Sequence, residues 1–424
     1  MGDYSQQLTQ DGTRRGVVMQ HLRFHVYESP SNIFQYQNRG RHFHMKRSQN
    51  SAFKTGRNAA ATLTAIGISA SCLAIGMSPA GAAANLRTVP AASKGPWTID
   101  LSNTSLDNGW RLEMQAAAKL AVQSGALSKQ VHLNIVNAPN TVAGQIQSVQ
   151  SMIAAHVSAI VIDANSPTAL NTVMGEAVSA GIPVISIDSP TTSTAVYHIG
   201  TNLVESGYVE GMWLAEQLHG KGNVVMSEGI TGTGGAEQEN EGGYMAFKKF
   251  PGIHIVDQYN GQWADAPSEA GMASVLATHS DINGVWNEGG ADGVMQAFIK
   301  AHRPLVPITG YAFNNFMLDP FSNPSLKMVA GSNPCYMSVT GIQEAVKVLE
   351  GQSVPKNYAF PITMYEYPTL TMMPATPKIA GWSAPVYTLD KKGTTAVPGL
   401  SAEFSFPYLA PGFNYSLKQL EAAM

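Results

Sequence analysis

Short apolar runs alternate with helical spacing from Trp97 to about residue 350. The runs at 158–166 and 182–190 are almost continuously apolar, as buried parallel strands require. One intervening segment places its apolar residues on a single helical face, at Val142, Ile146, Val149 and Ile153. This alternation predicts βαβ units, with parallel sheets covered by helices on both faces.

About nine strands are expected over the body of the chain, and they fit two doubly wound lobes better than one wide sheet. A single (β/α)₈ barrel has a suitable length and is the alternative architecture. Residues 371–424 are rich in Pro, Thr and Tyr and show no periodicity. We expect this tail to be an extension packed over the body.

Residues 45–84 have the arrangement of a secretory signal peptide. Lys46, Arg47, Lys54 and Arg57 precede an uncharged apolar stretch, which Pro79 ends. Small residues then offer cleavage sites near Ala82–Ala84, so the body is expected in the periplasm. A permanent membrane anchor is one alternative, and a lipid-attachment motif ending at Cys72 is a weaker one.

Residues 1–44 lack hydrophobic periodicity, and Met45 is interpreted as the true start. The rival interpretation is a basic arm that binds nucleic acid, because residues 1–57 hold nine Lys/Arg against three Asp/Glu. From Arg87 onward the balance reverses, with 17 Lys/Arg against 26 Asp/Glu. An acidic body argues against nucleic acid as a partner. Two cysteines in 424 residues exclude a disulfide-stapled miniature.

Polar and aromatic side chains gather where the predicted strands end, which is where open parallel sheets bind ligands. Amides and carboxylates bind vicinal hydroxyls, and indole faces stack on sugar rings. The set therefore suits a neutral, polyhydroxylated ligand. Its members are Ser102, Asn103, Thr104, Asp163, Ala164, Asn165, Asp188, Ser189, Glu228, Trp263, Asn287, Glu288, Tyr311, Ser332 and Asn333. Asn and Asp at such positions also cap helices, and Trp110 could serve as a hydrophobic staple.

Common enzyme motifs are absent from the sequence: there is no phosphate-binding GxxxxGK[ST], no HExxH, no CxxC and no GxSxG. No catalytic residue, metal or organic cofactor is therefore expected. Asp188 and Glu228 could in principle form a glycosidase carboxylate pair, which keeps a hydrolase as a remote alternative.

Seven blocks between about 97 and 370 resemble the periplasmic sugar-binding proteins of ABC importers, in the ribose- and galactofuranose-binding group. The blocks are LSNTSLDNGWR (101–111), SAIVIDANSP (158–167), AGIPVISIDSP (180–190), HIGTN (198–202), EGITGTGG with NEGGYMAF (228–247), DINGVWNEGGADGVMQAF (281–298) and VPITGYAF (306–313). The resemblance implies two α/β lobes joined by three crossing strands. One lobe would hold 97–200 with about 333–362, and the other 203–331 with about 363–370.

The resemblance also implies site residues, motif by motif. Asn108 and Trp110 match the asparagine and stacking aromatic of the first loop, followed by Arg111 as in galactofuranose-type binders. Asp188 matches the aspartate that holds sugar hydroxyls, and Trp263 the aromatic of the opposite lobe. The remaining expected positions are Asn240 at an arginine, Asn287 or Glu288 beside Gly289, and Ser332 in the last crossing.

Three departures from ribose binders concern charge. Ser189 and Asn240 stand at arginine positions, and Ala312 stands at an aspartate. Ribose is therefore not predicted; a smaller polyol, a deoxy sugar and a differently shaped pyranose remain open. The expected function is capture of a neutral sugar or polyol by a monomer that delivers it to an ABC permease. A periplasmic sensor for a membrane kinase or chemoreceptor is the alternative that the sequence leaves open.

Overall fold

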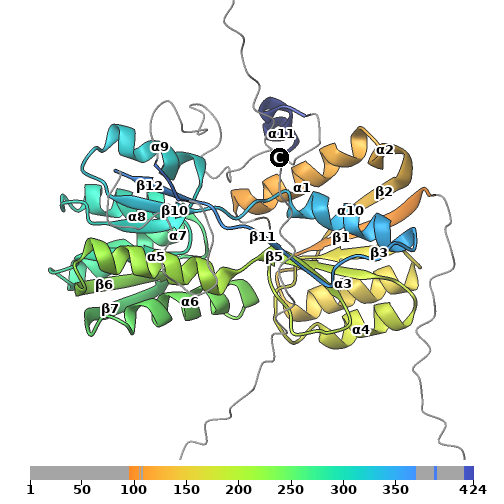
Figure 1. The fold of residues 1–424 in the computed structure, drawn as a ribbon, viewed down its shortest axis with the longest axis horizontal. Helices are drawn as coiled ribbons and strands as arrows, with labels where there is room; N and C mark the ends of the chain where they lie inside the picture. The colour runs from red at the N-terminus through yellow and green to blue at the C-terminus, as the bar shows by residue number, and fades with distance from the viewer. Residues whose placement is uncertain (1–94, 105, 107, 369–385, 389–414) are drawn as a thin grey trace, which may run out of the picture. The chain divides into compact units, whose positions relative to one another are not determined.

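Two separate β-sheets organise the chain in the computed structural model, which describes residues 95–104, 106, 108–368, 386–388 and 415–424. All of these residues fall within one compact unit, 82–424. Two sheets exclude the single barrel and confirm the predicted pair of doubly wound lobes (Figure 1). The expected leader at 45–84 and the extension at 1–44 lie outside the described residues.

The first sheet is wholly parallel, in the order β11-β5-β4-β3-β1-β2. Its strands are β1 (Trp97–Asn103), β2 (Val131–Asn137), β3 (Ala159–Ile162), β4 (Val184–Ile187), β5 (Tyr197–Thr201) and β11 (Asn357–Phe360). The helices of this lobe are α1 (Gly109–Gln123), α2 (Leu127–Gln130), α3 (Val142–Ala154), α4 (Asn171–Ser179) and α10 (Met337–Leu349). Every residue of β3 and β4 is buried, because helices cover both faces of the central strands.

The second sheet has the order β13-β12-β10-β9-β8-β6-β7. Its strands are β6 (Lys221–Glu228), β7 (Gly252–Asn260), β8 (Gly284–Asn287), β9 (Ile308–Tyr311), β10 (Met328–Gly331), β12 (Met364–Tyr367) and β13 (Val386–Thr388). Its helices are α5 (Leu203–Gln217), α6 (Gly234–Phe247), α7 (Asp265–Thr278), α8 (Ala291–Lys300) and α9 (Asn314–Ser322). In this sheet β12 pairs antiparallel with β10, and β13 pairs parallel with β12.

The chain passes between the two lobes three times. It leaves the first sheet after β5, returns after β10, and crosses again between β11 and β12. We call the lobe of the first sheet the N-terminal lobe and that of the second sheet the C-terminal lobe. Among the described residues, no helix combines the length and apolar character that crossing a membrane requires.

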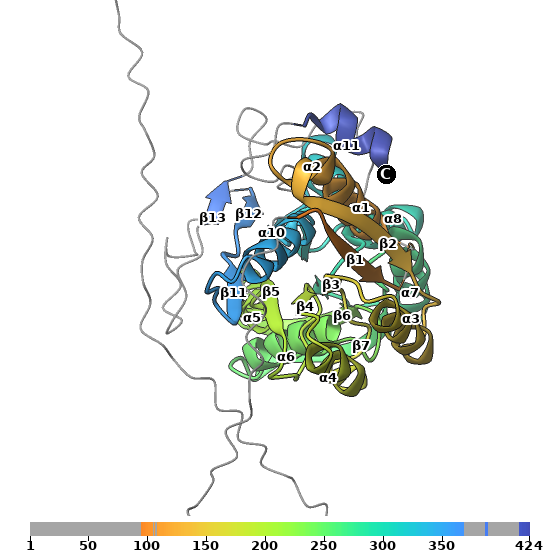
Figure 2. The ribbon, with the colours of Figure 1, turned by 90° about the vertical axis from the view of Figure 1, so that its right-hand side faces the viewer.

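The tail contains a helix that its lack of periodicity did not predict. α11 (Leu417–Ala423) begins with a capping box, in which Ser416 and Gln419 satisfy each other's backbone N–H groups. It packs on α1 (Figure 2), and Tyr415 and Leu420 are buried in the core of the N-terminal lobe. A helix of seven residues is too short to show a periodic pattern in the sequence. It is also too short to be stable by itself, so its contact with α1 stabilises it. The described end of the tail does pack over the body, as expected.

Candidate functional site

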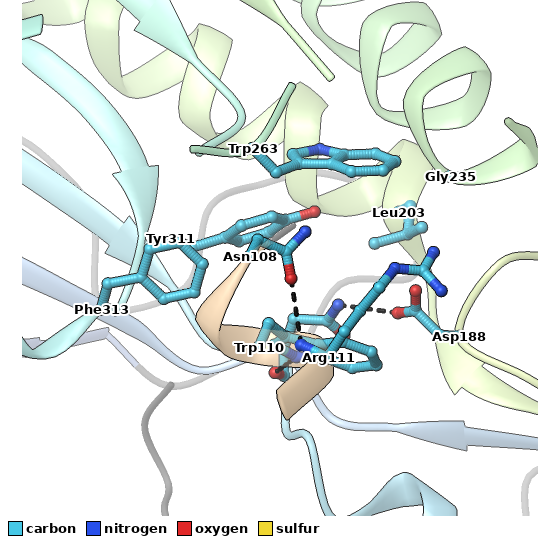
Figure 3. A pocket seen from close by; sticks show the side chains of 10 residues that line it. Asn108, Trp110, Arg111, Asp188, Leu203, Gly235, Trp263, Tyr311 and Phe313 are labelled. Atoms are coloured by element: carbon cyan, nitrogen blue, oxygen red, sulfur yellow. Dashed lines mark hydrogen bonds between the residues drawn. The ribbon is translucent and has the colours of Figure 1, made fainter. Parts of the chain in front are cut away.

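A pocket lies where α1 begins and where β4 and β9 end. It encloses about 390 Å³ of space between its lining atoms, and part of that space is open to solvent. The N-terminal lobe and the C-terminal lobe both line it, together with one residue of the second crossing (Figure 3). The lining residues are Asn108, Trp110, Arg111, Asp188, Leu203, Gly235, Trp263, Tyr311, Phe313 and Asn333.

The start of α1 places three of the predicted residues in the pocket. Asn108 is the N-cap: its Oδ1 accepts a hydrogen bond from the backbone N of Arg111 at 3.0 Å. This cap fixes the first turn and therefore the direction of Trp110. The Trp110 Nε1 donates to the backbone O of Asn333 at 2.8 Å, which leaves the indole face to the pocket.

Arg111 is held by its own lobe. Its Nη1 lies 2.5 Å from Asp163 Oδ2 and 2.5 Å from Asn103 Oδ1, and the arginine and both partners are buried. The Asp163 carboxylate offsets the free-energy cost of burying the guanidinium charge at the site. Arg111 therefore lines the pocket with its charge already compensated, as a neutral ligand would require.

Asp188 follows β4 with a backbone φ of 55°, a conformation that a non-glycine residue adopts at a cost in free energy. Its Oδ1 accepts from Asn333 Nδ2 at 2.9 Å. Burial, with the neighbouring Asp163 charge, raises the pKa of Asp188 to about 7. Asn333 also accepts from Thr201 Oγ1 at 3.0 Å, so one amide connects β4, β5 and the second crossing at the pocket.

The C-terminal lobe contributes Trp263 and Tyr311, each held by a buried glutamate. The Trp263 Nε1 donates to Glu288 Oε2 at 2.7 Å, and the backbone φ of Trp263 is 55°. The Tyr311 hydroxyl donates to a carboxylate oxygen of Glu239. In Figure 3 Trp263 and Trp110 lie on opposite sides of the pocket, as stacking on two sides of one ring requires.

Three fully buried carboxyl groups lie behind this wall: Glu210, Glu239 and Glu288. None of the ion pairs among the described residues involves them. Burial raises the pKa of Glu239 to about 8, and burial with the neighbouring carboxylates raises the pKa values of Glu210 and Glu288 well above the usual range. At neutral pH the cluster is therefore largely protonated, which avoids burying three like charges together.

The structure brings five of the nine predicted residues to the pocket: Asn108, Trp110, Arg111, Asp188 and Trp263. Glu288 lies behind Trp263 as its hydrogen-bond acceptor. Asn287 is fully buried, and its backbone N donates to Thr309 Oγ1 at 2.9 Å. Ser332 was expected in the last crossing but lies in the second, and its Oγ accepts from the backbone N of Thr363 in the last crossing at 3.0 Å. Asn287 and Ser332 therefore stabilise the backbone around the site.

Asn240 is the prediction that the structure places elsewhere. In α6, Gly235 lines the pocket and Glu239 lies one turn later on the same face. The next residue is turned about 100° away, and Asn240 instead borders a surface depression with Glu241 and Tyr244.

The close packing of Trp263 explains why position 289 is a glycine. A Cβ added there would lie 3.1 Å from the Cα and 3.3 Å from the Cβ of Trp263. A side chain at this position would therefore require Trp263 to move by a few tenths of an ångström. Leu203, Gly235, Tyr311, Phe313 and Asn333 were not predicted as site residues, although Tyr311 and Asn333 stand at the strand ends where a ligand was expected.

This chain is similar in sequence and in structure to several proteins named as binding proteins. The ribose import binding protein of Escherichia coli is 25% identical over 277 residues, covering 64% of this chain and 91% of that protein. A solved ABC transporter solute binding protein from Thermobispora bispora superposes with a TM-score of 0.60 at 26% identity, covering 68% of this chain and 91% of that one. The fructose-binding periplasmic domain of a hybrid two-component system superposes with a TM-score of 0.57 at 25% identity, covering 64% and 91%. The model of the periplasmic binding protein domain matches residues 99–353, and the chain therefore belongs to that family.

Proposed function

We propose that this protein is an exported solute-binding protein that captures a neutral sugar or polyol and delivers it to an ABC import permease. The observation that carries the proposal is the pocket between Trp110 and Trp263, with Asn108, Asp188 and Asn333 along one side. Two indoles can cover the faces of a sugar ring while amide and carboxyl groups bind its hydroxyls. Relatives named as sugar-import binding proteins support the same assignment.

Capture would proceed by closure of the two lobes about the three crossings. The moving bodies would be 97–200 with about 333–362, and 203–331 with about 363–370. Trp110 and Asp188 belong to the first body and Trp263 to the second, so closure would complete the pocket. Ser332 and Asn333 lie in the second crossing, where Asn333 bonds to both Asp188 and Trp110. A ligand that contacts both bodies would favour the closed state by mass action.

Export to the periplasm is part of the proposal and is supported by the leader at 45–84 and by the periplasmic relatives. The same relatives also support a role as a binding protein without enzymatic activity. The hydrolase alternative loses its carboxylate pair, because Glu228 is not among the pocket residues and accepts from the Tyr244 hydroxyl at 2.9 Å.

Sensing is the second candidate, favoured by the likeness to the sugar-binding domain of a hybrid two-component system. Uptake of the labelled ligand by cells with and without the gene distinguishes the two. Loss of uptake in the deletion strain supports transport. Unchanged uptake with loss of a ligand-induced transcriptional response supports sensing.

A thermal-shift screen of the protein from Ala83 onward tests the ligand class. The panel holds neutral hexoses, pentoses, deoxy sugars, polyols and several amino acids, because ligand binding raises the unfolding midpoint by mass action. We expect one sugar or polyol to raise the midpoint by several degrees, and the Asp188→Ala variant to lose most of that shift. A shift with an amino acid alone would contradict the sugar assignment.

A further inference from the structure

The two walls of the pocket differ in the groups that they offer a ligand. The N-terminal lobe and the second crossing offer amide, guanidinium and carboxyl groups from Asn108, Arg111, Asp188 and Asn333. The C-terminal wall consists of Leu203, Gly235, Trp263, Tyr311 and Phe313. Only two side-chain atoms of that wall can form hydrogen bonds, the Trp263 Nε1 and the Tyr311 hydroxyl oxygen.

Both of these groups already donate to the interior. The Trp263 N–H is bound to Glu288 at 2.7 Å, and the Tyr311 hydroxyl is bound to Glu239. Both glutamates are fully buried, and each has a second carboxyl oxygen without a hydrogen bond from the described residues. Turning either donor toward a ligand would leave a further buried oxygen unpaired, which costs free energy. The two glutamates are therefore positioning residues that keep the side-chain donors of the C-terminal wall away from a ligand, and the Tyr311 oxygen remains as the one side-chain acceptor of that wall.

The opposite wall is arranged in the reverse way. Trp110 has its N–H bound to Asn333, so its indole face meets the ligand, while the Asn333 amide lies beside Asp188. Hydroxyl groups of a ligand can find partners on this side. A hydroxyl turned to the C-terminal wall would find no free side-chain donor there. Away from the Tyr311 oxygen it would meet rings and a leucine side chain, where burial without a partner is unfavourable.

We infer that the ligand of this pocket is a deoxy sugar. It binds with its hydroxylated edge toward Asn108, Asp188 and Asn333, and with its deoxygenated carbon toward Leu203, Trp263 and Phe313. This inference rests on the proposed function, since it names the sugar class for the same pocket. Glu239 and Glu288 act on this selectivity through Tyr311 and Trp263, without touching the ligand.

Isothermal titration with matched sugar pairs tests the inference. Each pair differs by one oxygen atom: D-fucose with D-galactose, L-rhamnose with L-mannose, and 2-deoxy-D-ribose with D-ribose. We expect the deoxy member of at least one pair to bind on the order of 10- to 100-fold more tightly than its partner, because an apolar site rejects an added hydroxyl by about this factor. Equal or tighter binding of the hydroxylated member in every pair that binds would overturn the inference and leave the proposed function standing. Absence of binding by all six sugars, together with binding of an amino acid, would overturn both.

A variant with a polar group in the C-terminal wall tests the cause of the preference. Leu203 occupies the first position of α5, where an asparagine is tolerated. Leu203→Asn should reduce the preference for the deoxy sugar by about tenfold, by offering a partner to the added hydroxyl. The matched control is Ile299→Asn, which places the same amide on the exposed surface of α8 and should leave the preference unchanged. An unchanged preference in a folded Leu203→Asn protein would overturn the assigned wall, and the wild-type pairs remain decisive if that variant does not fold.

Discussion

The two lobes bury carboxyl groups behind the same pocket but compensate them differently. In the N-terminal lobe, Asp163 has the guanidinium of Arg111 at 2.5 Å. In the C-terminal lobe, Glu210, Glu239 and Glu288 have no such cation in the described part of the chain. Burial raises the pKa of Asp163, and the Arg111 charge opposes that rise, whereas burial and neighbouring carboxylates together raise the pKa values of Glu210 and Glu288 with no cation to oppose them. The N-terminal wall therefore depends on an ion pair, and the C-terminal wall depends on protonated carboxyl groups. Mutation and pH should affect the two walls differently.

The largest effect is expected on removing the cation. Arg111→Ala leaves Asp163 buried and unpaired, which should lower the free energy of unfolding by about 3–5 kcal/mol. Urea denaturation measures the loss. The double variant Arg111→Ala/Asp163→Asn should recover a large part of it, since the orphaned charge is gone. A loss below about 1 kcal/mol would show that the pair carries little of the stability of the N-terminal lobe.

A smaller effect is expected from pH, with a defined sign. The folded-state pKa of Glu239, about 8, lies above its ordinary value of 4.5, so the folded protein holds the extra proton. The stabilisation from this group is complete below pH 4.5 and is lost progressively up to about pH 8, by at most about 1.4 kcal/mol per pH unit.

Glu239→Gln should make the fall in unfolding free energy shallower by up to about 1.4 kcal/mol per pH unit in that range. Denaturant titrations between pH 5 and 8.5 measure the slope. Glu241→Gln, on the exposed side of the same helix, is the matched control. Identical slopes for the wild type and Glu239→Gln would contradict protonation of the cluster.

Substitutions of Trp110 and Trp263 allow the contributions of the two walls to ligand affinity to be compared. Trp110→Ala and Trp263→Ala should each weaken binding of the identified sugar by about 2 kcal/mol, through loss of a stacking ring. Calorimetry measures the affinity, and circular dichroism confirms that the variants fold. Trp110→Phe should retain part of the affinity, because the ring remains while the hydrogen bond to Asn333 is lost. Unchanged affinity in both alanine variants would show that the sugar binds elsewhere.

The smallest effect is expected at the surface, where charges are paired in water. Lys300 and Glu269 lie 2.5 Å apart on the outside of the C-terminal lobe, and the lysine side chain is 64% exposed. Glu269→Ala should change the unfolding free energy by less than about 0.5 kcal/mol, because solvent screens such pairs. A loss comparable with that of Arg111→Ala would mean that burial does not explain the difference between the two pairs.

The sequence predicted the elements whose signal is local. The apolar runs at β3 and β4 and the helical spacing in α3 follow from the period of burial within one element, and the structure confirms them. It did not predict α9, which carries Pro320 inside it, or the antiparallel pairing of β12. Both depend on neighbours distant in the chain: α9 packs against α8 and β10, and β12 pairs with β10.

The site residues divide in the same way, into those with a local sequence signal and those that depend on distant contacts. Asn108, Trp110 and Asp188 stand in local motifs, an N-cap before a helix and the end of a buried strand, so their neighbourhood could be inferred. Asn240 was misplaced because the motif does not show which face of α6 meets the pocket, and adjacent residues of a helix point about 100° apart. Asn333 was recognisable only as a strand-end amide, since its partners are more than 130 residues away in the chain.

By itself, the sequence determined the two-lobed α/β fold and the family, because hydrophobic periodicity and short motifs record burial element by element. The tertiary structure alone decided which hydrogen-bonding groups face a ligand. Trp263 and Tyr311 are polar aromatics in the sequence, yet Glu288 and Glu239 take up their donors and leave a wall without a free side-chain donor. That outcome depends on contacts between α6, β8, β9 and the loop after β7, and the free-energy cost of an unpaired buried polar group is what selects them.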